Sequence, residues 1–485
     1  MVDIIYRKEL DVGNTRKSVE VGFMGGTDTV TEETLLSQKV GKTSYNVSGD
    51  SGALTDTYGI GEVFAEDGSK MQGTMPVDSV WFFNLGENGN RYFMHGGSYG
   101  DLIYFDTLHP TGPKSTLLSY DSPPALVKFR LQDGDSVLIT HPDGPFAVYQ
   151  NFGLYKYEEG PKFKSVCVHY ERLFGITGQD NILYFSANLD PLNWNVSSEE
   201  GGYIEFADER GKLLRIVSFM DYVYLFRENG ITRLSAFADQ MDFSVKHIFT
   251  TTGNVYPDTV AICGDRMLFM CKDGIYVFNG SDTVKILSNL DNYYCDVDNF
   301  DACAAYHNGK YVLALRIDFA DGAAVLCEQG DYVNNALIIY DVSNGSYTVM
   351  RGMDVCWLTG TVSPSNKLLM CFNGTHSNKL GCLTDDGMMF GEPLPKSWAG
   401  PLTDLGQSLA VKHLKYIVLY TLYDITLTVE SDGEKREIEV RGSKKSQKIP
   451  VRLSGRLFRV SYGTNLQHMK VARPKLVFTT GSSEV

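Results

Sequence analysis

The sequence predicts an all-β protein whose body is a β-propeller, a ring of repeated antiparallel sheets. Composition, a recurring two-strand unit and tight hairpin signals lead to this prediction. The 485 residues include 28 Tyr, 26 Phe and 48 Gly against 16 Pro, a balance that favours strands and tight turns over helices. A chain of this length exceeds one compact core, so we expect several domains, or one repeat-built domain with additions.

The recurring unit consists of an apolar strand, a short polar turn and a second strand rich in Tyr, Phe and Val. Copies begin at Ser79, Asp135, Cys167, Leu214, Thr259, Cys303 and Lys367. The steps from Cys167 to Leu214, Thr259 and Cys303 lie close to the spacing of a four-stranded propeller blade, about 40 to 50 residues. The sequence therefore predicts a ring of about six to eight blades.

Tight turns within these units indicate antiparallel hairpins. Asn-Gly or Asp-Gly separates two apolar runs at Asn229-Gly230, Asp273-Gly274 and Asn308-Gly309, which is the strongest short hairpin signal. The run from Met267 to Cys271 is apolar on both faces, as a sheet stacked between two neighbours requires. A pair of β-sandwiches or an irregular β-solenoid is the structural alternative.

Three domains are expected. Residues 1–74 are polar and rich in Gly, Thr and Ser, which predicts an extended N-terminal arm. Residues 75–392 hold the repeats and are assigned to the propeller. Residues 393–485 are expected to form a β-sandwich-like C-terminal domain, because Ile425, Leu427 and Val429 alternate with polar residues as in a sheet solvated on one face.

Charge is distributed unevenly along the chain. The net charge is −15, yet the residues from Lys396 onward hold 15 Lys and Arg against 8 Asp and Glu. An acidic body argues against wrapping nucleic acid, whereas the basic C-terminal domain could face an acidic partner or DNA. An ordinary solvated surface is the alternative interpretation.

Neither a membrane span nor a signal peptide is evident in the sequence. The nine Cys include no C-x-x-C pair, a pattern that indicates free thiols made in a reducing compartment. Most lie in apolar strand-like runs and are expected to be buried: Cys167, Cys263, Cys271, Cys303 and Cys371.

No motif predicts an enzyme or a cofactor. A G-x-S-x-G pattern runs from Gly96 to Gly100, but its strand-like flanks place Ser98 in a glycine-rich hairpin loop rather than at a nucleophile elbow. Asp296, Asp298 and Asp301 are weak candidates for a Ca²⁺ site, since the EF-hand pattern is missing. A solvated loop is the preferred interpretation, so we expect no bound metal.

One stretch resembles a phrase found in tail hub or nozzle proteins of tailed bacteriophages, also called packaged-DNA stabilisation proteins. The residues that carry the resemblance are Arg172, Leu173, Tyr184, Asp190, Pro191 and Trp194. The segments after this phrase resemble the propeller blades and the small β-domain of those proteins. The similarity covers about 165 to 460 and leaves the N-terminal arm outside.

The resemblance implies a structural protein of the virion tail, assembled in the host cytoplasm. Identical subunits would form a six-fold ring below the portal and the head–tail adaptor. The ring would contact other tail proteins, extend the channel for double-stranded DNA without sequence preference, and help retain or gate the packaged genome. No membrane insertion by this chain is implied.

Two other functions stay open. One is a carbohydrate-binding or carbohydrate-cleaving propeller that recognises a receptor, with a pocket on the ring axis lined by Tyr, Trp and carboxylates. The other is a cytosolic propeller that binds cellular proteins.

Overall fold

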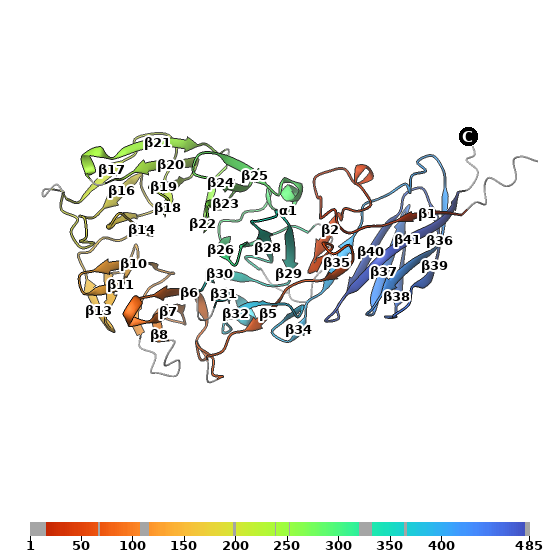
Figure 1. Ribbon diagram of the computed structural model, residues 1–485, viewed down its shortest axis with the longest axis horizontal. Helices are drawn as coiled ribbons and strands as arrows, with labels where there is room; N and C mark the ends of the chain where they lie inside the picture. The colour runs from red at the N-terminus through yellow and green to blue at the C-terminus, as the bar shows by residue number, and fades with distance from the viewer. Residues whose placement is uncertain are drawn as a thin grey trace, which may run out of the picture.

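The protein is all-β, with a β-propeller joined to a pair of packed sheets (Figure 1). The structure is a computed structural model that describes residues 16–65, 68–106, 116–196, 200–237, 239–251, 253–319, 332–362 and 366–480. Within these ranges the one α-helix is α1 (Asp291–Tyr294), and a few 3-10 turns accompany the strands. The predicted fold class is confirmed.

Seven sheets of mainly antiparallel strands follow one another around the ring. The first four contain β6 (Val77–Asn84), β7 (Asn90–Gly96), β8 (Asp101–Asp106) and β9 (Thr116–Ser119); β10 (Ala125–Leu131), β11 (Gly134–Thr140), β12 (Phe146–Gln150) and β13 (Gly153–Tyr157); β14 (Ser165–His169), β15 (Arg172–Ile176), β16 (Ile182–Phe185) and β17 (Gly202–Glu205); and β18 (Leu213–Phe219), β19 (Tyr222–Arg227), β20 (Gly230–Ser235) and β21 (Ser244–Phe249).

Three further sheets complete the ring, and the last of them includes a strand from the N-terminal part of the chain. They contain β22 (Val255–Cys263), β23 (Arg266–Cys271), β24 (Gly274–Phe278) and β25 (Thr283–Ile286); β26 (Cys303–His307), β27 (Lys310–Leu315), β28 (Ala336–Asp341) and β29 (Tyr347–Arg351); and β30 (Val355–Gly360), β31 (Leu368–Phe372), β32 (Gly381–Thr384), β5 (Gly59–Glu62), β33 (Met388–Met389) and β34 (Glu392–Pro393). Strand β5 pairs with β32 and so completes the last sheet.

The ring closes because each sheet buries both of its faces against neighbours. In β23, Leu268 packs into the core shared with the next sheet, whereas Met267 and Phe269 pack into the core shared with the preceding one. All three side chains are fully buried. The first strand of the first sheet, β6, lies beside the first strand of the last sheet, β30, which joins the two ends of the ring. Alternate side chains of one strand thus serve two cores.

The predicted hairpins are confirmed. The dipeptides at Asn229, Asp273 and Asn308 connect β19 to β20, β23 to β24 and β26 to β27. In the last turn both residues have positive φ, 48° at Asn308 and 79° at Gly309, as a type I′ turn requires. In the other two turns, the glycine alone has positive φ.

Two further sheets pack face to face beside the ring (Figure 1). One contains β1 (Lys17–Glu20), β3 (Val47–Ser48), β4 (Leu54–Asp56), β36 (Lys412–Thr421), β39 (Gln447–Gly455) and β41 (Lys470–Thr480). The other contains β2 (Thr43–Tyr45), β35 (Lys396–Ala399), β37 (Ile425–Ser431), β38 (Glu434–Val440) and β40 (Arg459–Thr464). Inward residues such as Ile417 and Leu427 meet in one core, and we call the pair the sandwich.

The N-terminal segment differs from the extended arm expected over residues 1–74. Its described part pairs with strands far along the chain: β1 and β4 with β41, β2 with β35, and β5 with β32. These strands are short and carry little periodicity, so their partners cannot be read from local sequence. The segment therefore runs from the sandwich to the last sheet of the ring and ties the two together.

Buried polar side chains hold this joint. Asn46 donates from Nδ2 to the carbonyl oxygens of Arg351 (3.0 Å) and Pro395 (2.7 Å), and its Oδ1 accepts from the backbone N–H of Arg351 (2.9 Å). Lys396 donates from Nζ to three carbonyl oxygens, those of Gly387, Leu394 and Leu466. Since both side chains are almost completely buried, these bonds fix the sandwich against the ring.

Candidate functional site: the axial cavity

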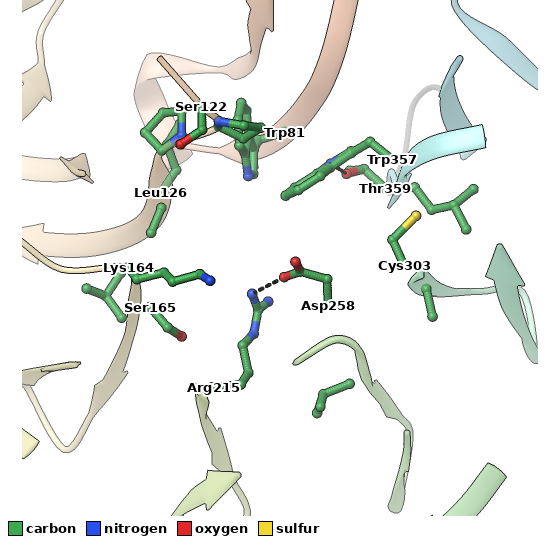
Figure 2. A pocket seen from close by; sticks show the side chains of 17 residues that line it. Trp81, Ser122, Leu126, Lys164, Ser165, Arg215, Asp258, Cys303, Trp357 and Thr359 are labelled. Atoms are coloured by element: carbon green, nitrogen blue, oxygen red, sulfur yellow. Dashed lines mark hydrogen bonds and ion pairs between the residues drawn. The ribbon is translucent and has the colours of Figure 1, made fainter. Parts of the chain in front are cut away.

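A cavity of about 440 Å³ lies where the first strands of the seven ring sheets converge (Figure 2). Every one of these first strands, or the residues next to it, contributes to the wall. The labelled side chains are Trp81, Ser122, Leu126, Lys164, Ser165, Arg215, Asp258, Cys303, Trp357 and Thr359. Because the ring builds its axis from equivalent strands, residues from seven separate repeats meet here.

Two tryptophans stand where the ring closes. The rings of Trp81 on β6 and Trp357 on β30 meet edge to face, with centroids 5.2 Å apart. Trp357 donates from Nε1 to the carbonyl oxygen of Val80 (2.8 Å), and Thr359 donates to the same oxygen. The pair therefore seals the contact between the first and last sheets and presents an aromatic wall to the cavity.

Opposite charges face the cavity from neighbouring sheets. Arg215 on β18 donates from Nη1 to Oδ1 of Asp258 on β22, at 3.1 Å (Figure 2). Lys164, just before β14, extends its Nζ to 5.8 Å from the ring centroid of Phe300. The ion pair is partly exposed, so it adds little to stability and remains available to a polar ligand. Asp258 is the one carboxylate among the described residues of the wall.

A Ser–His pair at the cavity edge lacks the geometry of a nucleophile. His141 accepts the backbone N–H of Asp143 at Nδ1 (3.1 Å), so its Nε2 carries the proton and donates to Ser122 Oγ (2.9 Å). A histidine in this tautomer cannot take the proton of Ser122. Burial also lowers the pKa of His141, which keeps the ring neutral.

A second histidine, His95, forms hydrogen bonds within the first ring sheet. Its Nδ1 donates to Asp78 Oδ1 (2.8 Å) and its Nε2 to the carbonyl oxygen of Tyr120 (3.0 Å). Burial disfavours the charged ring, but the hydrogen bond and the charge of Asp78 outweigh it, so the pKa of His95 is raised. Its two donors connect the residue after β9 to the inner strand β6.

The residues of the phage-like phrase build a corner on the third ring sheet. Arg172 donates from Nη1 to the carbonyl oxygens of Ser186 and Glu200. Asp190 accepts the N–H of Leu192, and Trp194 donates to the carbonyl oxygen of Pro191.

Other residues of the phrase are packed into the same corner. Leu173 is fully buried between the second and third sheets. The rings of Tyr184 and Trp194 both pack on Phe163, with centroids 5.7 and 5.1 Å from it. The phrase therefore specifies a folded loop, and its residues lie outside the axial cavity.

The three aspartates considered for Ca²⁺ lie in the loop before β26. Asp298 accepts the backbone N–H of Phe300, and the carbonyl oxygen of Asp301 accepts from Asn334. Across the described ranges, no three His, Cys, Asp or Glu side chains come together as metal ligands. The structure thus does not bring Asp296, Asp298 and Asp301 into one coordination site.

The expected burial of the free thiols is confirmed. Cys167, Cys263, Cys271, Cys303 and Cys371 are all buried and unpaired. Burial raises the pKa of Cys303, so this thiol stays protonated and unreactive although it adjoins the cavity. Ser98 lies between β7 and β8, in the hairpin loop that was predicted.

Sequence reasoning missed the cavity residues themselves. A usable signal existed, because Arg215 and Asp258 are isolated charges within otherwise apolar first strands of two consecutive repeats. Equivalent positions in successive propeller repeats converge on the axis. No helix within the described ranges is long and apolar enough to cross a membrane.

The chain matches no protein-family model and no curated protein. Among solved structures it is similar to BBS1N in complex with ARL6DN (12% identity, 67% of this chain and 96% of that chain, TM-score 0.43). It is also similar to the Neurospora crassa Pan2 WD40 domain (9%, 68% and 94%, 0.37) and to BamB from Moraxella catarrhalis (11%, 61% and 81%, 0.34). Likenesses this weak carry no information about function.

Proposed function

We propose that this chain is a structural subunit of a tailed-bacteriophage virion. Identical copies form a six-fold ring in the tail, below the portal and adaptor, which extends the DNA channel and helps retain or gate the packaged genome. The chain acts through contacts between surfaces rather than through a reaction. Its virion location rests on the phrase from Arg172 to Trp194, and its ring assembly rests on the charge and rigidity of the body.

The observation that carries the proposal is the opposite charge of two rigidly joined parts. Strands β36, β39 and β41 of the sandwich contain no Asp or Glu and expose six Lys or Arg. The chain as a whole has a net charge of −15, so the acidic excess lies elsewhere, mostly on the ring. A body with complementary ends can bind copies of itself head to tail.

Rigidity matters because a closed ring needs the same angle at every contact. A flexible hinge between ring and sandwich would let contacts close at many angles and give open chains. The buried bonds of Asn46 and Lys396 oppose such a hinge. Tyr347 adds a further tie, because its hydroxyl donates to the carbonyl oxygen of Thr27 at 2.8 Å.

Mass photometry and negative-stain electron microscopy of the purified full-length chain test the proposal. We expect one oligomeric species whose population increases with protein concentration and whose projections show a central opening. A chain that stays monomeric at every concentration and salt level would overturn the structural-ring function.

The axial cavity favours a second candidate, a carbohydrate-binding propeller that recognises a receptor. Trp81 and Trp357 offer aromatic surface, and Arg215 and Asp258 offer polar partners, the combination that sugar sites use. A glycan array with the wild type and an Arg215→Ala variant distinguishes this function. Glycan binding that this variant abolishes would favour it, whereas a blank array would count against it.

A further inference from the structure

An apolar patch with an acidic rim lies on one face of the ring. Its large side chains, which we call the ring patch, are Tyr170, Leu189, Met220 and Phe237, exposed by 41%, 58%, 57% and 62%. They come from the connections β14–β15, β16–β17, β18–β19 and β20–β21 of two adjacent sheets. First-to-second and third-to-fourth connections leave a propeller sheet on the same face.

Contacts of Tyr170 and Glu171 connect the four loops that carry these side chains. The ring of Tyr170 lies 5.1 Å from that of Phe237, and its hydroxyl donates to Asp221. The backbone N–H of Leu189 donates to the carbonyl oxygen of Glu171. Exposed acids border the patch: Glu171, Asp190, Asp221, Asp239 and Asp242. Contiguous apolar surface framed by charge is typical of a protein interface.

The backbone under the ring patch is strained. Tyr170, Glu171, Leu189 and Met220 have φ of 42°, 63°, 61° and 52°, a region that bulky residues rarely occupy. The equivalent first turn of the sixth sheet uses Asn308 and Gly309, which tolerate this conformation. Because a turn without this strain is possible at the same position of another sheet, the strained residues of the ring patch indicate a function other than folding.

The outer face of the sandwich sheet β39–β36–β41 has the opposite character. Its exposed charges, which we call the basic face, are Lys415, Lys448, Arg452, Lys470, Arg473 and Lys475. None of the six forms an ion pair with another described residue. Val418 pairs with Lys448 on one side and with Lys475 on the other, so two like charges flank one apolar residue.

The two lysines lie two strand spacings apart, about 10 Å, so both add positive charge to the same face of the sheet. The centre of the basic face is apolar and aromatic, with Tyr416 stacked against the ammonium of Lys448 at 3.9 Å. The basic face and the ring patch therefore both have an apolar centre within a charged border, and the charges of the two borders are of opposite sign.

We propose that the basic face of one copy docks on the ring patch of the next copy of this chain. The contact is head to tail, so each subunit uses one surface of each kind, and it rests on the proposed assembly into a ring. Double-stranded DNA would also bind basic residues, but it has no need of the apolar centre or of the patch on the propeller. The matched pair of surfaces favours a second copy.

Charge reversal on both sides tests the contact. We expect Lys448→Glu with Lys475→Glu, or Glu171→Lys with Asp221→Lys, to raise the concentration of half-assembly roughly ten- to hundred-fold. The fourfold variant restores attraction with the signs exchanged and should assemble again. Lys156→Glu with Lys272→Glu, two exposed lysines outside both surfaces, makes the same change in net charge as the first pair and should assemble like the wild type.

Sedimentation velocity at low and high salt gives the readout, with circular dichroism to verify folding and fluorescence anisotropy of a short DNA duplex as a second arm. Rescue by the fourfold variant establishes the contact. Assembly of both double variants at wild-type concentrations overturns it while leaving the ring proposal intact. Loss of duplex binding with unchanged assembly in Lys448→Glu with Lys475→Glu overturns it in favour of DNA. A wild type that never assembles overturns both proposals.

Discussion

Replacing Asn46 by Ala, which weakens the joint between ring and sandwich, should lower the free energy of unfolding by about 4 kcal/mol. Asn46→Ala removes three buried hydrogen bonds, each contributing about 1 kcal/mol. The residue also has φ of 57°, where Ala costs about 1 kcal/mol more than Asn. Urea unfolding followed by circular dichroism and Trp fluorescence measures the loss.

A matched variant separates these contributions. Asn308 has φ of 48° in an exposed turn and makes no side-chain hydrogen bond to a described residue, so Asn308→Ala should cost about 1 kcal/mol. Asn46→Ala should also broaden the unfolding transition, because it weakens the coupling between sandwich and ring that Lys396 and Tyr347 still maintain. Equal losses in the two variants would refute the role given to the joint.

Three further changes probe other parts of the molecule. Arg227 is completely buried and donates to the carbonyl oxygen of Gly211 and to the partly exposed Asp208, so Arg227→Ala should destabilise the chain by about 2 to 3 kcal/mol, read from urea unfolding, and a loss below about 1 kcal/mol would refute that role. Burial lowers the pKa of Lys396 to about 8, so the unfolded chain holds this proton more tightly, and Lys396 adds stability as pH rises from about 8 to its ordinary pKa near 10.4. Buried thiols with raised pKa values act in the opposite direction in both proteins, so the difference in unfolding free energy between wild type and Lys396→Met should shift toward the wild type over this range, and a difference that does not change with pH would contradict it. Tyr170→Asn relaxes a strained turn, so it should raise the free energy of unfolding by about 1 kcal/mol and the melting temperature with it, while it weakens assembly. A lower melting temperature would argue against strain.

Sequence periodicity was sufficient for the ring because its information is local. Each hairpin, such as the one at Asn308-Gly309, lies within one repeat, and the doubly apolar run at Met267 reports its two neighbours directly. The N-terminal segment could not be read in this way. Its strands pair with residues several hundred positions away, and the pairing depends on backbone bonds that leave little trace in short polar segments.

The same contrast between local and long-range information holds for the candidate functional residues. The resemblance drew attention to Arg172 and Trp194, which are conspicuous in sequence because they build a compact local corner. Arg215 and Asp258 lie 43 residues apart in separate repeats, and only the packing of two neighbouring sheets makes them partners. The ring patch also escapes a sequence search, because exposure and left-handed backbone at Tyr170 are properties of the folded turn.

Cryo-electron microscopy of the assembled full-length protein can show whether this chain works as a subunit of a head-to-tail ring. We expect a closed ring in which the sandwich of each copy, through the strands around Lys448 and Lys475, covers the propeller connections at Tyr170 and Met220 of its neighbour. A monomer, or a ring whose contacts leave both surfaces open to solvent, would contradict it.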